Sequence, residues 1–133
     1  TTCTYDGIKA KIENKGDSCI IQANMPFLFE AFKLGARGVM ATPTSCGGAF
    51  FQRFFDAFTS GDMALAEKRF QEIILLDCAI DSGFNCSAKY LVNLQGVKGM
   101  QPRNRGGQKL SAARMESLKA FHAWCVAEGL MKK

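Results

Sequence analysis

Apolar residues in the first part of the chain occur both at helical spacing and in short continuous runs. Residues 4–16 place Ile8 and Ile12 four positions apart, which predicts a helix with one apolar face. Gly16 follows this segment, and a glycine at that position is expected to end the helix.

Two short segments are predicted to be buried strands, at residues 17–24 and 37–43. Both contain adjacent rather than alternating apolar residues, which is typical of strands covered on both faces. The segment between them, 25–36, has Pro26 in its first turn and Gly35 at its end, and predicts a helix. A strand, a helix and a second strand in this order indicate the βαβ unit of a parallel sheet.

The rest of the chain has the spacing of helices. Five phenylalanines on one broad face of the segment 47–61 indicate a helix packed on a core. Asp62 and Ser111 are the expected N-caps of two later helices. The predicted helices of this part cover residues 47–61, 63–81, 86–95 and 111–128.

Two parallel strands cannot bury both of their faces and both of their edges. A βαβα module followed by further helices instead fits the last quarter of a (β/α)8 barrel, which takes about 250 residues in all. We therefore expect residues 1–61 to supply the last barrel units and residues 62–133 to form a C-terminal helical extension. The rest of the barrel would come from protein outside this chain.

Composition and charge exclude several other classes of protein. Hydrophobic residues make up 47% and charged residues 22% of the 133 residues, which fits a folded globular chain. No apolar run has the length that crosses a bilayer, and the start lacks the features of a signal peptide. Because the chain does not begin with Met, we expect that it starts after processing, cleavage or truncation. The basic segment 101–109 has no aromatic residue to stack on bases, so no nucleic-acid partner is expected.

The cysteines and the histidine give no sign of a metal centre. The six cysteines form no CxxC pair and His122 is the only histidine, so a zinc site is not expected. Their wide spacing favours reduced, mostly buried thiols in a cytoplasmic protein. Cys46 follows a predicted strand and is a candidate reactive thiol, although a buried structural role is favoured.

Four segments of the sequence resemble the C-terminal part of the dihydrodipicolinate synthase / N-acetylneuraminate lyase family. The resemblance covers essentially the whole chain and depends on the order and spacing of the segments. They are TTCTYDGIKAKI (1–12), IIQANMPFLFEAFKLGARGVMATPTSCGGAFFQRFFDAFTSGDMALAEKRFQEIILL (20–76), NCSAKYLVNLQGV (85–97) and KLSAARMESLKAF (109–121).

The resemblance implies a (β/α)8 TIM barrel with a helical extension, commonly as a cytoplasmic homotetramer. Family members are class I aldolases or lyases in which a lysine on strand 6 forms a Schiff base with pyruvate or a related 2-oxo acid, without a cofactor. In this alignment the chain begins just after that lysine. No lysine lies in either predicted strand, and Tyr5 and Tyr90 do not match the tyrosine that relays protons in the family. The chain alone is therefore expected to be inactive and to carry no catalytic residue.

The resemblance also suggests which residues of this chain would contact the substrate. Ala23 and Asn24 follow the first predicted strand, and the family has a glycine at the position of Ala23. Met40 and Thr42 match positions that pack around the Schiff base, and Thr44 and Ser45 lie where a hydroxyl would bond the substrate. The alternative for these residues is ordinary turn chemistry. The complete set is Ala23, Asn24, Met40, Thr42, Thr44 and Ser45.

Two other functions remain open at this level. A different TIM-barrel enzyme would bind a phosphorylated substrate at the strand exits and at the helix that begins near Gly47 and Gly48. A helical assembly module without enzymatic activity would use the phenylalanines and the terminal helices. The expected partners of the aldolase are the upstream remainder of the barrel, a 2-oxo acid and further copies of the protein.

Overall fold

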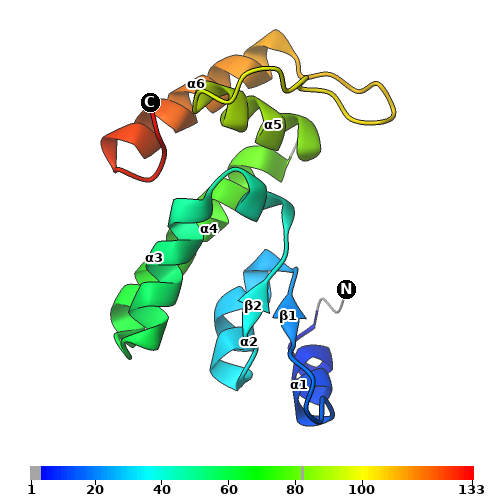
Figure 1. The fold of residues 1–133 in the computed structure, drawn as a ribbon, viewed down its shortest axis with the longest axis vertical. Coiled ribbons are helices and arrows are strands. Elements are labelled where there is room, and N and C mark those ends of the chain that lie inside the picture. Colours follow the sequence, from blue (N-terminus) through cyan, green and yellow to red (C-terminus); the bar gives the residue numbers. More distant parts are fainter. Residues whose placement is uncertain (1–3, 82) are drawn as a thin grey trace. The chain divides into compact units, whose positions relative to one another are not determined.

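The computed structural model describes residues 4–81 and 83–133 and divides them into two compact units. The first unit ends at Ala41 and the second begins at Thr42. Each unit has its own apolar core. Figure 1 shows the order of the elements along the chain.

The first unit contains a parallel two-stranded sheet and two α-helices. β1 pairs with β2 so that Ile21 lies opposite Gly38 and Gln22 opposite Val39. The helices α1 and α2 pack against each other, and their buried side chains include Ile8, Leu28 and Phe32. The elements are α1 (Tyr5–Glu13), β1 (Ile21–Gln22), the 3₁₀ turn η1 (Met25–Phe27), α2 (Leu28–Leu34) and β2 (Gly38–Val39).

The ends of the first two helices follow from local side-chain chemistry. The hydroxyl of Thr4 accepts a hydrogen bond from the Gly7 amide and caps α1. The prediction that Gly16 ends this helix is wrong, because α1 stops at Glu13 and Asn14 caps it. Gly35 does end α2, at φ 111°, a left-handed conformation that glycine adopts without strain.

Both strands are much shorter than the predicted segments 17–24 and 37–43. Within the part of the chain that the structure describes, each strand has one partner, so its other edge gains no ladder of hydrogen bonds. Pro43 cannot donate to such a ladder, and the backbone turns into the 3₁₀ segment η2 (Thr42–Ser45) instead of continuing β2. The parallel pairing and the helix between the strands agree with the prediction.

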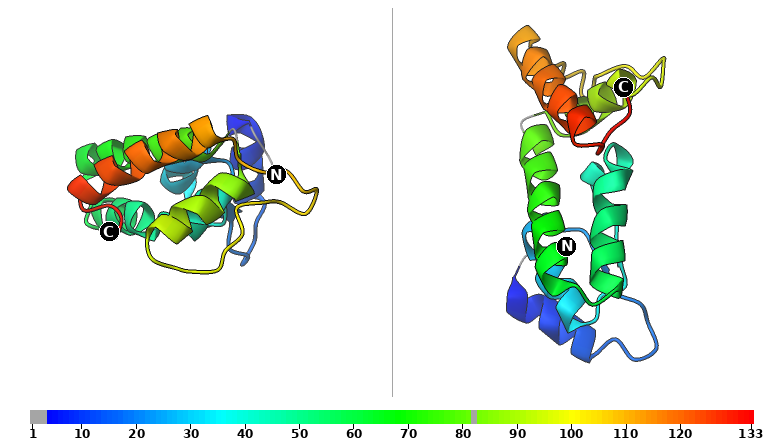
Figure 2. Two further views of the ribbon diagram at one scale, coloured as in Figure 1. Left: turned by 90° about the horizontal axis from the view of Figure 1, so that it is seen from above. Right: turned by 90° about the vertical axis from the view of Figure 1, so that its left-hand side faces the viewer.

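The second unit consists of η2 and four α-helices. They are α3 (Gly48–Thr59), α4 (Met63–Asp81), α5 (Asn85–Leu94) and α6 (Ala112–Ala127). Figures 1 and 2 show α3 and α4 side by side, and α5 packs against α6. As predicted, Asp62 accepts from the Leu65 amide at the start of α4, and Ser111 accepts from the Arg114 amide at the start of α6.

The core of this unit lies between α3 and α4. Phe50 and Phe54 of α3 and Ile73 and Leu76 of α4 are fully buried. The helices approach closely where α3 begins, because a Cβ atom at Gly47 would overlap the side chain of Leu76. Glycine at this position therefore allows α4 to pack directly against the start of α3.

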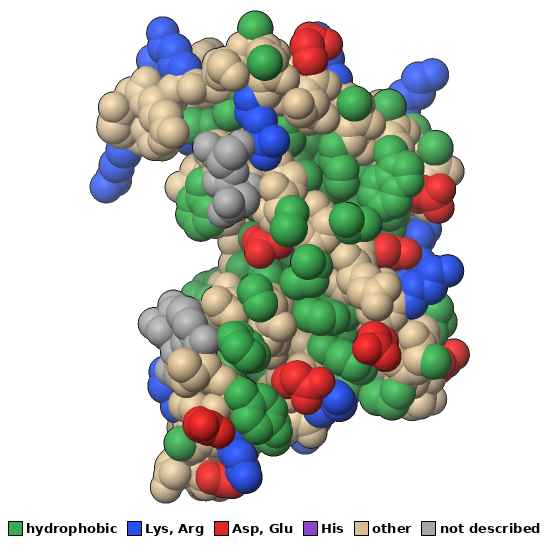
Figure 3. Space-filling view, turned by 180° about the vertical axis from the view of Figure 1, so that it is seen from behind, with side chains coloured by type: hydrophobic (Ala, Val, Ile, Leu, Met, Phe, Trp, Pro, Cys, Tyr) green, Lys and Arg blue, Asp and Glu red, His purple; other side chains and the backbone are tan. Residues whose placement is uncertain are grey.

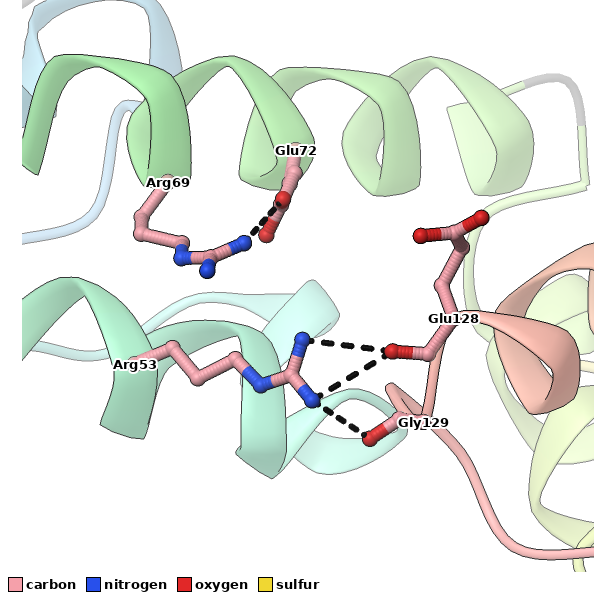
Figure 4. Close-up of polar contacts among 5 residues, drawn as sticks. All are labelled: Arg53, Arg69, Glu72, Glu128 and Gly129. Carbon is pink, nitrogen blue, oxygen red and sulfur yellow. Dashed lines mark hydrogen bonds and ion pairs between the residues drawn. The ribbon is translucent and has the colours of Figure 1, made fainter. Parts of the chain in front are cut away.

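One arginine on each of α3 and α4 makes polar contacts that are drawn in Figure 4. Arg69 of α4 forms an ion pair with Glu72 at 2.5 Å, and both side chains are largely buried. Arg53 of α3 donates to the carbonyls of Glu128 and Gly129 at the end of α6, at distances of 3.0 to 3.3 Å. Arg53 thus connects two helices that lie far apart in the sequence.

Several large apolar side chains remain exposed on α4 and α6. Leu75 is 52% exposed, and Met63, Leu65 and Trp124 are about two-fifths exposed. Figure 3 shows one face on which hydrophobic side chains lie among interspersed acidic and basic ones. None of the helices described at 4–81 and 83–133 is long and apolar enough to cross a membrane.

Candidate functional site

The first candidate residues lie where the two strands end. The amide of Met40 donates to the carbonyl of Gln22 at 2.9 Å, which extends the parallel pairing by one bond beyond β2. Continuing the register places Ala23 beside Met40 at the carboxyl ends of the strands. The structure therefore brings these two predicted residues together.

The two faces of this sheet are covered very differently. Side chains alternate along a strand, so Ile21, Ala23 and Met40 share one face and Gln22 lies on the other. Ile21 is 55% exposed and Met40 is 72% exposed, whereas Gln22 is only 5% exposed. The face that carries the candidate residues is thus open.

Asn24 is half-buried at the start of η1. Its backbone carbonyl accepts a hydrogen bond from the Gln22 side-chain amide at 3.1 Å. Its own side-chain oxygen Oδ1 is buried and has no hydrogen-bond partner among the described residues. An unsatisfied buried oxygen costs stability, so this amide is a good candidate to bind a donor group that the chain itself does not supply.

The other candidates, Thr42, Thr44 and Ser45, lie in η2 and belong to the second unit. Ser45 is exposed and its hydroxyl donates to the Thr42 carbonyl at 2.7 Å, while Thr42 and Thr44 are half-buried. The side chain of Gln95 donates to the carbonyl of Cys46 at 2.8 Å and fixes the end of this turn to α5. This arrangement is a well-ordered turn that leaves the Ser45 side chain accessible.

The start of α3 retains few unbonded amides. Gly47 donates its N–H to the Pro43 carbonyl at 3.0 Å. Only the N–H groups of the first residues after Gly47 therefore remain free to bind an anion. No acidic residue occupies the first turn of α3.

The lysines and tyrosines of this chain lie outside the two strands. β1 and β2 contain no lysine, and Lys89 lies on α5. Tyr5 is 41% exposed at the start of α1, and Tyr90 lies on α5, away from both strands in the sequence. Among the described residues, no cluster of histidine, cysteine or carboxylate side chains is suited to hold a metal ion.

The described cysteines are free, and Cys3 lies outside the described residues. Cys46, Cys86 and Cys125 are buried, whereas Cys19 and Cys78 are exposed. Burial raises the pKa of Cys46 from 9.0 to about 12, and the neighbouring Cys125 adds to the shift. Burial also raises the pKa of Cys125 to about 12. These thiols stay protonated at neutral pH, so Cys46 is not the reactive thiol that its position allowed.

We expect iodoacetamide at pH 8 to alkylate Cys19 and Cys78 and to leave Cys46 and Cys125 unmodified, because thiolates are the reacting species. Above pH 9 the unfolded thiols ionise before the folded ones, so these groups make folding less favourable as the pH rises towards 12. Peptide mass mapping after alkylation checks the first statement, and unfolding experiments between pH 8 and 10 check the second. Rapid alkylation of Cys46 in the folded protein would contradict both.

One group of residues near Ser45 was not predicted from the sequence. A hollow of about 450 Å³ is lined by Ser45 together with Asn85, Lys89, Asn104 and Arg105. The feature of the sequence that could have indicated them is the absence of acidic residues from positions 83–115.

Comparison with known proteins supports the fold. No protein-family model matches the chain, and no curated protein matches it by sequence. A solved structure of a protein from Coccidioides immitis, described as belonging to the dihydrodipicolinate synthase family, matches with a TM-score of 0.78. The identity is 16%, and the match covers 98% of this chain but 46% of the other.

The chain thus spans about half the length of the structure that it matches. Its helices and its small parallel sheet are consistent with part of a barrel, as the resemblance implied. At this level of identity the likeness establishes a fold shared with a dihydrodipicolinate synthase family protein.

Proposed function

We propose that this chain is the C-terminal part of a class I aldolase or lyase that acts on pyruvate or a related 2-oxo acid. It would supply the last two βα units of a (β/α)8 barrel and a helical extension. The fold likeness to a dihydrodipicolinate synthase family protein supports this proposal at the level of architecture. The catalytic lysine would lie just upstream, in protein outside this chain.

The open face of the sheet is the observation that carries the proposal. Parallel strands are normally covered on both faces, yet here Ile21 and Met40 are 55% and 72% exposed. Among residues 4–81 and 83–133 the sheet has two strands, so both of its outer edges lack partners there. A barrel completed by six further strands would pair these edges and enclose this face.

In such a barrel the substrate lies at the carboxyl ends of the strands, where the candidate residues occur. The Ala23 carbonyl and the Asn24 amide would face the substrate, and Met40 and Thr42 would pack around the Schiff base. Thr44 and Ser45 would bond a substrate hydroxyl or carboxylate at the rim of the site. The lysine amine would attack the ketone carbon to form a carbinolamine, which would lose the former ketone oxygen as water. The resulting protonated imine would accept electrons from the carbon–carbon bond being broken.

The whole enzyme would require more than this chain. The upstream segment of the barrel is the partner that this chain requires. Assembly as a homotetramer and a cytoplasmic location follow from the family resemblance, and no cofactor is required by this chemistry.

Reduction with borohydride in the presence of pyruvate tests the function. We expect a stable adduct on the segment that completes the barrel, and none on this chain, because this chain has no lysine in a strand. Intact mass, followed by peptide mapping of the purified protein, locates the adduct.

The same treatment without pyruvate is the control, since borohydride alone leaves lysine amines unchanged. An adduct on a lysine of this chain would overturn the assignment of the catalytic residue. No adduct on any segment of the complete protein would overturn the aldolase proposal itself.

A further inference from the structure

The positive charge of the protein is concentrated in one segment. Residues 83–115 contain six basic residues and no acidic residue. The other 11 basic and 12 acidic residues of the chain nearly cancel, so the net charge of +5 arises in this segment. It comprises α5, the loop that follows it and the start of α6 (Figure 1).

Part of this charge surrounds the hollow beside Ser45, which we call the Lys89 hollow. Its polar lining consists of Ser45 from η2, Asn85 and Lys89 from α5, and Asn104 and Arg105 from the loop. Ala88, Val92 and Met100 add apolar surface. A volume of about 450 Å³ lies within the range of small-molecule sites, about 300–1,000 Å³.

The loop that contributes Arg105 is fixed by its own hydrogen bonds. The side chain of Asn104 accepts from the Gln108 amide at 3.0 Å and donates to the Gln108 side chain at 2.8 Å. Arg103 and Lys109 form an antiparallel bridge across the loop. Lys89 donates to the Arg103 carbonyl at 2.9 Å, so the loop is tied to α5. Lys89 and the loop that carries Arg105 are therefore held together before any ligand binds.

Nothing in the described chain neutralises these cations. Neither Lys89 nor Arg105 takes part in an ion pair within residues 4–81 and 83–133. The first residue of α5, Asn85, lines the same hollow, and the start of a helix also favours negative charge. An anion bound between two cations offsets their mutual repulsion.

We propose that the Lys89 hollow binds a small molecule through its carboxylate or phosphate group. Lys89 and Arg105 would pair with the anion, while the side-chain N–H groups of Asn85 and Asn104 would bond its remaining polar groups. The lining has no aromatic residue on which a base would stack, which favours a small molecule over single-stranded nucleic acid. This site is independent of Schiff-base chemistry and does not require the catalytic lysine.

Titration of the purified protein with inorganic phosphate, a phosphate monoester and a dicarboxylate tests the proposal. We expect saturable binding by calorimetry that weakens as salt increases. The variants Lys89→Gln and Arg105→Gln are each expected to weaken binding about tenfold. Arg105→Gln is the cleaner variant, because Lys89 also holds the loop.

Two matched controls remove the same charge elsewhere. Lys68→Gln on the exposed surface of α4 and Arg37→Gln in the first unit should leave binding unchanged. A preference for phosphate or dicarboxylate identifies the ligand group. Equal losses in the control variants, no saturable binding, or much tighter binding of a single-stranded oligonucleotide would each overturn the proposal. Loss of binding with an intact pyruvate adduct would separate this site from the proposed aldolase site.

Discussion

Replacing Leu76 with alanine is expected to lower the free energy of unfolding of the second unit by about 2–5 kcal/mol. Leu76 is fully buried on α4 and reaches the point where Gly47 begins the neighbouring helix. The substitution removes apolar surface from the core and leaves a cavity that the close packing of α3 and α4 cannot fill. Denaturant unfolding followed by the fluorescence of Trp124 in α6 measures the loss.

The adjacent residue provides a matched control. Leu75 lies on the same helix but is 52% exposed, so Leu75→Ala makes the same chemical change with little loss of buried surface. We expect it to cost less than about 1 kcal/mol, typical of surface changes. Equal losses for the two variants would show that α4 does not pack on α3 through the face that carries Leu76.

Replacing Arg53 with methionine is expected to destabilise the second unit by about 1–3 kcal/mol. The guanidinium donates to the carbonyls of Glu128 and Gly129, at the end of α6 where helix carbonyls lack partners. Its positive charge also lies at the negative end of the helix dipole. Methionine preserves much of the apolar stem, so the loss reports on the polar contacts shown in Figure 4.

Hydrogen exchange at the end of α6 distinguishes this mechanism from general destabilisation. Arg53→Met should increase exchange of the Gly129 and Leu130 amides more than exchange in α4. Arg53→Lys should recover part of the stability, because it keeps the charge but loses the fork of donors. Lys68→Met removes an exposed charge from α4 and serves as the control. Unchanged exchange in Arg53→Met would contradict the capping role.

Local signals in the sequence predicted the helices well. Asp62 and Ser111 cap their helices as expected, and α4 has the predicted bounds, because side-chain oxygens bond the free amides of a first turn. Gly35 ends α2 for the equally local reason that it adopts a positive φ. Gly16 did not mark the end of α1, because the helix already ends at Glu13 with Asn14 as its C-cap.

The strands could not be delimited in the same way. A strand extends only as far as a neighbour pairs with it, and the sequence does not state how many neighbours are present. With a single partner, each strand has two residues, and the chain turns into η2 at Thr42. The candidate residues Ala23 and Met40 are adjacent because of the register between β1 and β2, which long-range pairing sets.

The sequence by itself determined the order of helices and strands, their caps and the absence of a lysine from both strands, since these depend on residues near in the chain. It also contained the uneven charge of residues 83–115. Only the tertiary structure decided which face of the sheet is open, that Cys46 and Cys125 are buried, and that Ser45, Lys89 and Arg105 line one hollow. These features join residues that are distant in the sequence, and packing alone brings such residues together.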